Sequence, residues 1–134
     1  MLMLLFSALI AMLPSSTSRV SDYATAYQKA QTEDKPLMVI VSAKWCPACQ
    51  TLKNTTIKEM EASGELDEVS VAVVDHDADP KLAGELMRGG SIPQIIVFTK
   101  ANSGGWKRSQ LTGFQSRGPV RNLIRSAVSA VRRG

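Results

Sequence analysis

Cysteine is scarce in this chain: its 134 residues include only two, Cys46 and Cys49, together with a single histidine, His76. Two cysteines cannot form the several disulfides that hold a small secreted scaffold together, and they cannot make a zinc site of cysteines alone. We also find no internal repeat and no low-complexity tract. Because the chain is long enough to bury an ordinary hydrophobic core, a single globular domain is expected.

Acidic residues are missing from the C-terminal part of the chain, since all 12 of them lie at or before Glu85. From Arg88 onward every charged residue is basic, and the net charge of the whole chain is +4. A basic region can attract an acidic partner, a membrane surface or nucleic acid. No aromatic run alternates with these charges, so we expect no nucleic-acid partner. We interpret most of the basic residues as the solvated face and tail of a helix.

The N-terminus is almost entirely apolar from Met1 to Leu13, and small polar residues follow at 15–18. This pattern is typical of a secretory signal peptide, although no Lys or Arg precedes the apolar run. The run is shorter than the roughly 20 residues that cross a bilayer as a helix. We expect a signal peptide over residues 1–18, a domain over residues 19–134, and an exported protein, periplasmic or secreted. A buried N-terminal element or an uncleaved anchor is the alternative, and without a signal the protein would be cytoplasmic.

Helical and extended patterns alternate along the rest of the chain. Apolar residues at three- and four-residue spacing predict helices, whereas short β-branched apolar runs predict buried strands. We expect helices over residues 21–32, with Ser21 as the N-cap, and over 47–63, 80–87 and 120–131; strands are expected over residues 37–41, 69–74, 94–99 and 106–111. This order predicts an α/β fold, a central mixed β-sheet flanked by helices on both faces, with the last two strands forming a hairpin.

The two cysteines stand where the first buried strand ends and the second helix begins. Pro47 is favoured at the first helical position, so Cys46 should lie at the helix N-terminus, where backbone N–H groups and the helix dipole favour the thiolate. Cys49 would lie one turn further on the same side of the helix. It could attack a mixed disulfide on Cys46 and release the product, as a redox cycle requires.

Other interpretations of the pair stay open at this point. The cysteines could form a purely structural disulfide, or they could be two inert thiols. They could also bind a metal, but the other ligands would have to be His76 and the neighbouring aspartates, which follow a different strand. We expect no metal and no cofactor. His76 could alternatively shuttle a proton, although we interpret it as part of a polar loop.

A wider set of residues resembles the thioredoxin superfamily. It consists of Trp45-Cys46-Pro47-Ala48-Cys49 after an apolar strand, Ile92-Pro93 at the start of a later strand, and Gly113-Phe114-Gln115 at the end of the last one. The resemblance, closest to exported bacterial thioredoxin-like proteins, implies a thioredoxin fold over nearly all of residues 21–131. It also implies that Cys46 is the exposed nucleophile, that Cys49 is the shielded resolving thiol, and that a cis Ile92–Pro93 bond faces them. Trp45, Pro47 and Ala48 would help to shape the surface that receives a substrate.

The sequence also departs from the pattern of cytosolic thioredoxins. Those proteins have Gly-Pro between the cysteines, whereas this chain has Pro47-Ala48. They also carry a buried aspartate that helps to move the proton of the resolving cysteine, and the matching position here is Ile40. The lysine that accompanies this aspartate is replaced as well, with Val73 nearest in the next strand.

Taken together, the sequence predicts a thiol-disulfide oxidoreductase that exchanges disulfides with proteins through Cys46 and Cys49. We expect cysteine-containing protein substrates, an upstream redox partner protein and a monomeric chain. The alternative is a thioredoxin-fold binding or assembly module, in which the disulfide is structural and the basic C-terminal half docks an acidic partner.

Overall fold

The computed structural model describes residues 19–101 and 104–133, so the expected signal peptide over residues 1–18 lies outside the described residues. The described chain forms one five-stranded sheet in the order β1-β3-β2-β4-β5. Its strands are β1 (Val20–Ser21), β2 (Leu37–Ser42), β3 (Ser70–Asp75), β4 (Gln94–Lys100) and β5 (Trp106–Thr112). The sheet is mixed, because β2 pairs in parallel with β3 and antiparallel with β4. The expected hairpin is confirmed by the antiparallel β4–β5 pair.

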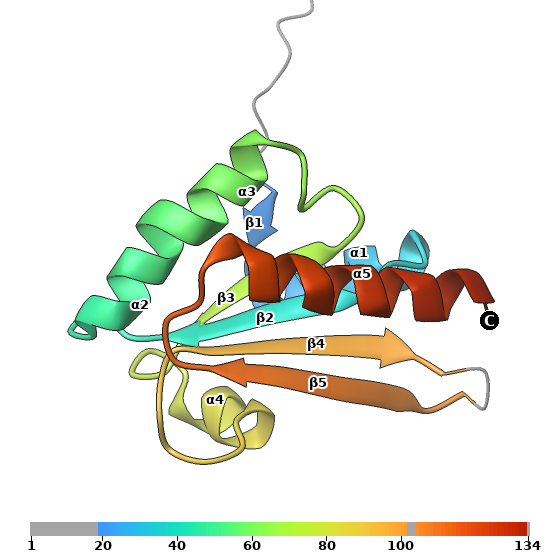
Figure 1. The fold of residues 1–134 in the computed structure, drawn as a ribbon. Coiled ribbons are helices and arrows are strands. Elements are labelled where there is room, and N and C mark those ends of the chain that lie inside the picture. Colours follow the sequence, from blue (N-terminus) through green and yellow to red (C-terminus); the bar gives the residue numbers. More distant parts are fainter. Residues whose placement is uncertain (1–18, 102–103, 134) are drawn as a thin grey trace, which may run out of the picture.

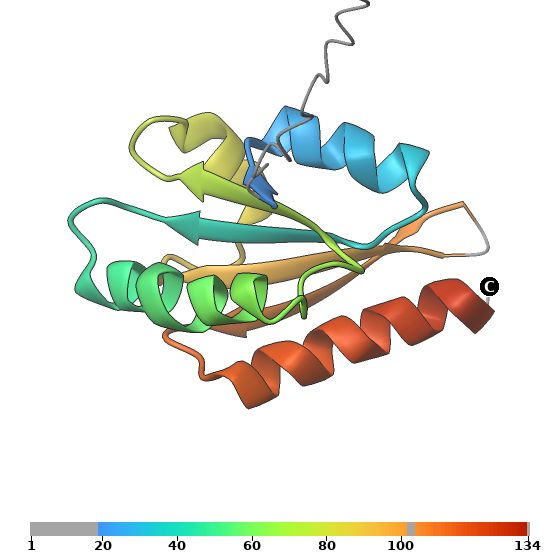
Figure 2. The ribbon, with the colours of Figure 1, turned by 90° about the horizontal axis from the view of Figure 1, so that it is seen from above.

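Helices cover both faces of this sheet, as Figures 1 and 2 show. One face carries α1 (Tyr23–Thr32) and α4 (Pro80–Leu86), and the other carries the long α5 (Arg117–Arg133). The helix that begins beside the cysteines lies on the same face as α5 and consists of α2 (Pro47–Thr51), η1 (Leu52–Ile57) and α3 (Lys58–Ala62). The expected α/β arrangement, a mixed sheet with helices on both faces, is therefore confirmed. Within the described residues, no helix is both long and apolar enough to cross a membrane.

Alternating side chains of the central strand β2 form two hydrophobic cores. Met38 and Ile40 point to the face covered by η1, α3 and α5, where they pack with residues such as Leu52 and Ile124. Leu37, Val39 and Val41 point to the face of α1 and α4. Both faces of β2 are thus buried, which explains why its sequence is a continuous apolar run without alternation.

Two elements differ from the sequence-based expectation, and the first lies at the N-terminal side. The prediction that Ser21 caps the first helix is wrong, because Ser21 ends a short strand, β1, that pairs in parallel with β3. The cap is Asp22, whose Oδ1 accepts a hydrogen bond from the backbone N–H of Thr25 at 2.9 Å. The two-residue strand escapes prediction because its partner, Val71-Ala72, is about fifty positions away, and a pair this short has no periodicity of its own.

The second helix is not uniformly α-helical as expected, because residues Leu52–Ile57 adopt a π-helix. The hydroxyl groups of Thr51 and Thr55 each donate to a carbonyl four residues earlier, at 3.0 and 2.6 Å. The buried hydroxyl of Thr56 donates to the carbonyl of Gln115, at 2.7 Å, in the segment before α5. Threonine side chains that bond to helix carbonyls compete with the regular backbone pattern, and single π-turns are common near functional sites.

Candidate active site

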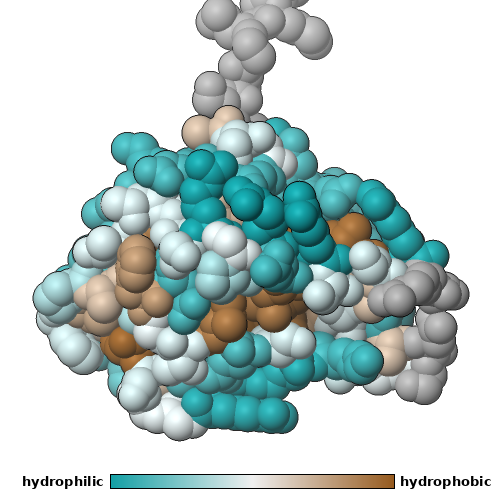
Figure 3. Space-filling view, in the orientation of Figure 1, coloured by the Kyte–Doolittle hydropathy of each residue, from teal (hydrophilic) through white to brown (hydrophobic). Residues whose placement is uncertain are grey.

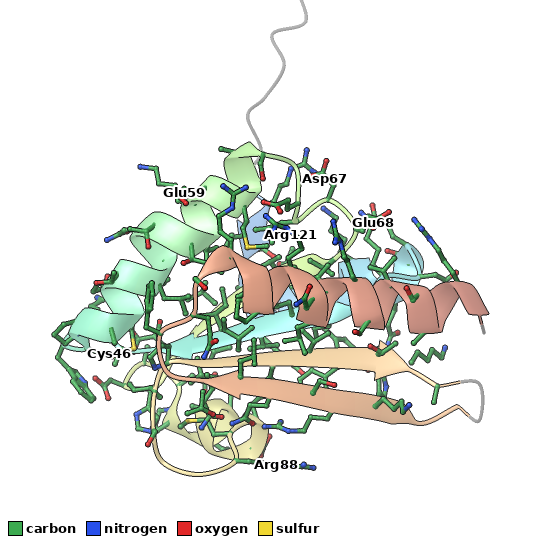
Figure 4. All side chains as sticks on the ribbon, in the orientation of Figure 1. Cys46, Glu59, Asp67, Glu68, Arg88 and Arg121 are labelled. Carbon is green, nitrogen blue, oxygen red and sulfur yellow. A yellow bond between two sulfur atoms is a disulfide. The ribbon has the colours of Figure 1, made fainter. Side chains whose placement is uncertain are left out.

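The dithiol lies at the carboxyl end of β2, where the chain turns into α2. A backbone hydrogen bond from Cys46 N–H to the carbonyl of Ala43, at 3.2 Å, forms this turn. Pro47 occupies the first turn of the helix and Cys46 is its N-cap, with its Sγ accepting from the backbone N–H of Cys49 at 3.2 Å. Figure 4 shows Cys46 at the beginning of α2. The two cysteines form a disulfide with their Cα atoms 5.2 Å apart.

Both cysteines are enclosed by apolar side chains. Cys49 is fully buried and Cys46 is only 5% exposed, in a small cluster with Ala43 and the partly buried Ile92. The resemblance implies an exposed Cys46, so its exposure is smaller than expected. The reason is tertiary: Ile92 belongs to a segment that lies 46 positions later in the chain but packs directly on the disulfide.

The segment before β4 completes the site. The Ile92–Pro93 peptide bond is cis, and the carbonyl oxygen of Ile92 lies 3.9 Å from Cys46 Sγ. The carbonyl of Pro93 accepts from the backbone N–H of Gly113 at 2.8 Å, which places the end of β5 beside the same segment. Phe114, the next residue, is 47% exposed. Apolar surface is visible at this end of the molecule, where α2 begins, in Figure 3.

Trp45 lies outside the apolar cluster around the disulfide. Its side chain is 67% exposed, and its Nε1 donates to Asp77 Oδ2 at 2.7 Å. Asp77 belongs to the loop after β3, which the sequence offered only as a possible source of metal ligands or of a proton shuttle and not as a partner of Trp45. That loop is shaped by Asp75, whose pKa is lowered by hydrogen bonds from the backbone N–H groups of Ala78 and Asp77 and by the charges of Lys44 and Lys53. No local signal links Trp45 to Asp77, because 32 positions separate them.

Ile40 lies fully buried in the supporting strand, opposite Val73 of β3 and Ile95 of β4. The buried polar side chains among the described residues are all uncharged: Ser42, Thr56, Ser70, Gln94 and Thr99. No carboxylate of the described chain is therefore buried next to Cys49 as a proton acceptor. Within the same residues, no group of three or more His, Cys, Asp or Glu side chains could hold a metal ion.

Much of the basic charge on α5 is paired, in agreement with its interpretation as structural. Arg117 and Arg121 both contact the carboxylate of Glu65, at 2.6 and 2.5 Å, and Arg132 contacts Glu68 at 2.5 Å. In Figure 4, Arg121 points from α5 toward the loop that follows α3. These ion pairs join the last helix to the connection between α3 and β3.

A separate cavity of about 480 Å³ lies by Tyr23, Phe98 and Trp106, and neither cysteine lines it. Trp106 begins β5, at the end of the hairpin turn. Its ring contacts Tyr27 of α1, and its side chain is 38% exposed. The cavity is therefore a feature of the α1 face of the sheet and does not belong to the dithiol site.

Comparison with known proteins identifies the class that this fold and dithiol define. The family model described as "Thioredoxin-like" matches residues 18–100. A curated thioredoxin from Alicyclobacillus acidocaldarius subsp. acidocaldarius is 33% identical over 91 residues, which cover 66% of this chain and 78% of that protein. The chain therefore belongs to the thioredoxin-like family.

Solved structures agree on the fold. A thioredoxin from Thermus thermophilus superposes with a TM-score of 0.69 at 24% identity, covering 82% of this chain and 87% of that one. The oxidised C-terminal domain of DsbD from Neisseria meningitidis superposes with a TM-score of 0.60 at 20% identity, covering 78% and 90%. At these identities the similarity establishes the thioredoxin fold alone.

Proposed function

We propose that this protein is a thiol-disulfide oxidoreductase that exchanges disulfides with protein substrates. The observation that carries the proposal is the Cys46–Cys49 disulfide at the β2–α2 junction, with the carbonyl of Ile92 3.9 Å from Cys46 Sγ. A thiolate at a helix N-terminus is a favoured nucleophile. The membership of a redox family supports the same chemistry.

In the reducing direction, the thiolate of Cys46 attacks one sulfur of a substrate disulfide and releases the other as a thiolate. Cys49, after losing its proton, then attacks Cys46 Sγ. This step forms the Cys46–Cys49 disulfide and releases the second substrate thiol, so two electrons pass from the dithiol to the substrate. The reverse sequence oxidises a substrate dithiol. An upstream redox partner protein would return Cys46 and Cys49 to the dithiol after substrate reduction, or to the disulfide after substrate oxidation.

A trapping experiment tests this assignment. Cys49→Ser should accumulate mixed disulfides between Cys46 and substrate proteins, visible as dithiothreitol-sensitive bands in non-reducing gels. Cys46→Ser is the matched control, since it keeps one thiol but removes the nucleophile. Equal trapping by Cys46→Ser, with none by Cys49→Ser, would reverse the assigned roles, and no trapping by either would refute the function.

A thioredoxin-fold binding module with a structural disulfide is the second candidate. It is favoured by the low exposure of Cys46, 5%, and by the absence of a buried carboxylate from the described residues. Equilibration with glutathione buffers separates the two functions. A redox-active pair should have a reduction potential between about −120 and −270 mV, whereas a structural disulfide typically lies below about −300 mV.

We also propose that the protein is exported, on the basis of the apolar N-terminal sequence. The N-terminus of the mature protein, determined by mass spectrometry after expression of the full chain, tests this. Cleavage near residues 16–18 would support export, and an intact cytoplasmic chain would contradict it.

A further inference from the structure

Segment 87–91 joins α4 to the cis Ile92–Pro93 bond, and its backbone carbonyls are satisfied mainly by side chains. Helix α4 ends with a hydrogen bond from Met87 N–H to Ala83, and the next backbone bond of this region belongs to Pro93. A connecting segment that crosses the end of a sheet must still satisfy its backbone polar groups. In this segment the task falls chiefly to one residue, Gln94.

The amide of Gln94 makes four short contacts with segment 87–91. Its Oε1 accepts from the backbone N–H of Arg88 at 3.2 Å, and its Nε2 lies within 3.0–3.2 Å of three carbonyl oxygens, those of Arg88, Gly89 and Ser91. The two N–H groups of this amide thus serve three carbonyl oxygens, so one N–H group is shared between two of them. Because a single donor faces one amide atom and three acceptors face the other, the hydrogen-bond network fixes the orientation of the amide.

Gln94 is also completely buried, with 0% of its surface exposed. It is the first residue of β4, where it pairs with Val41 of β2 and Thr112 of β5. A buried amide without its partners would be strongly unfavourable, so the side chain and segment 87–91 hold each other in place. Two neighbours on β5 add further contacts: Arg108 donates to the carbonyl of Leu86, at the end of α4, and Gln110 donates to that of Arg88. Neither of them is fully buried.

This anchoring matters because segment 87–91 leads directly into the part of the site that faces the dithiol. The carbonyl of Ile92 lies 3.9 Å from Cys46 Sγ. Among the described residues, no group accepts a hydrogen bond from the backbone N–H of Ile92. An extended substrate chain could therefore pair with the backbone of Ile92, provided that this backbone is held at a fixed distance from Cys46.

We propose that Gln94 is a positioning residue for protein-disulfide exchange: its buried amide fixes segment 87–91 and so holds the Ile92 backbone where a substrate chain meets Cys46. This role rests on the proposed function. It makes a specific claim about selectivity, because a small disulfide without a peptide backbone does not need Ile92, whereas a protein disulfide does.

Two substitutions and one control test the proposal. Gln94→Leu keeps the approximate size of the side chain but removes all four contacts. Gln94→Glu keeps the acceptor for Arg88 N–H, but its ionised carboxylate would face three carbonyl oxygens. The control is Thr99→Val, which removes another buried polar group, 6% exposed, from the far end of the same strand.

The measurement is the second-order rate constant of the reduced protein with insulin disulfides, divided by that with the small disulfide 5,5′-dithiobis(2-nitrobenzoate). Gln94→Leu should lower this ratio at least about fivefold, through the insulin rate, while Thr99→Val leaves it within about twofold. Gln94→Glu should lower the ratio at about pH 8 and regain part of it at about pH 5–6. Burial raises the pKa of such a carboxyl, and its protonated form can again donate a hydrogen bond.

The possible outcomes are distinguishable. If both rates fall together in Gln94→Leu, or if Thr99→Val changes the ratio as strongly, Gln94 has only a general structural role and the proposal is overturned. If Gln94→Leu does not fold, the pH dependence of the ratio in Gln94→Glu decides, and a ratio independent of pH overturns the proposal. A wild-type protein that reacts with neither disulfide refutes the proposed function itself.

Discussion

Ile40 lies directly opposite Val73 across the parallel β2–β3 pair, in the strand that leads to Cys46. By resemblance to cytosolic thioredoxins, these two positions would hold an aspartate and a lysine. Both are apolar here, and Ile40 is completely buried. The proton of Cys49 must therefore leave to water or to another group, which should make the resolving step slow and dependent on the access of solvent.

Ile40→Asp should accelerate this resolving step. A buried carboxylate can accept the proton of Cys49, and a positioned general base typically contributes at least about a hundredfold, so a rise of about tenfold or more is expected. The rate of release of the second substrate thiol in single-turnover experiments measures the step. Met38→Asp is the control, because Met38 is equally buried on the same face of β2 but lies further from the dithiol. An equal rate change in both variants would contradict the prediction.

The same substitution should make stability depend on pH. Burial raises the pKa of the introduced carboxyl above its value in the unfolded chain, so the neutral form is tolerated at low pH. As pH rises through the folded-state pKa, the carboxyl must ionise in the core, and the free energy of unfolding of Ile40→Asp should fall relative to wild type. Denaturant unfolding at several pH values measures this, and a parallel pH profile for variant and wild type would contradict it.

The carboxylate of Glu65 joins the end of the α3 region to the start of α5. Hydrogen bonds from Arg121, Arg117 and Ser63 lower its pKa from 4.5 to about 2. A depressed folded-state pKa contributes stability above the unfolded value of 4.5, and this contribution is lost as pH falls from about 4.5 to about 2. Glu65→Gln should therefore be less stable than wild type at about pH 7 and nearly equal to it at about pH 2.

Thermal unfolding at these two pH values measures the effect. Glu85→Gln serves as the control, because Glu85 is exposed and, within the described residues, forms no ion pair. If Glu65→Gln lowers the unfolding temperature by the same amount at both pH values, the ion pairs with Arg117 and Arg121 are not the cause of the lost stability.

The hydrogen bond from Trp45 to Asp77 should orient the indole ring beside the dithiol. Asp77→Ala removes the acceptor of this hydrogen bond. At this exposed position we expect the free energy of binding to protein substrates to weaken by about 0.5–1 kcal/mol, which corresponds to an apparent affinity about two- to fivefold lower. The fluorescence anisotropy of Trp45, measured in a Trp106→Phe background, should fall. Glu85→Ala, which removes an exposed carboxylate that forms no ion pair among the described residues, is the control. Unchanged anisotropy in Asp77→Ala would show that the hydrogen bond does not restrain the ring.

The outline of the fold could be predicted from the sequence because its signals are local. The apolar run Leu37–Ser42, the three- and four-residue spacing of α5, and Pro47 after Cys46 each indicate an element or its boundary without reference to distant residues. Local sequence patterns did not predict the elements that depend on contacts between distant segments of the chain. Strand β1 exists only through its pairing with β3, and the π-helix η1 includes Thr56, whose hydroxyl bonds to a carbonyl 59 positions away.

For the site, the chemistry could be inferred from the residues alone: two cysteines at a helix start, and no carboxylate at position 40. The surroundings of these groups depend on the tertiary fold. It buries Cys46 against Ile92, pairs Trp45 with Asp77, and places the amide of Gln94 among three carbonyls of segment 87–91. The physical reason is that sequence patterns report on periodicity and chain propensity, whereas burial and hydrogen-bond partners arise when distant segments meet at the edge of the sheet.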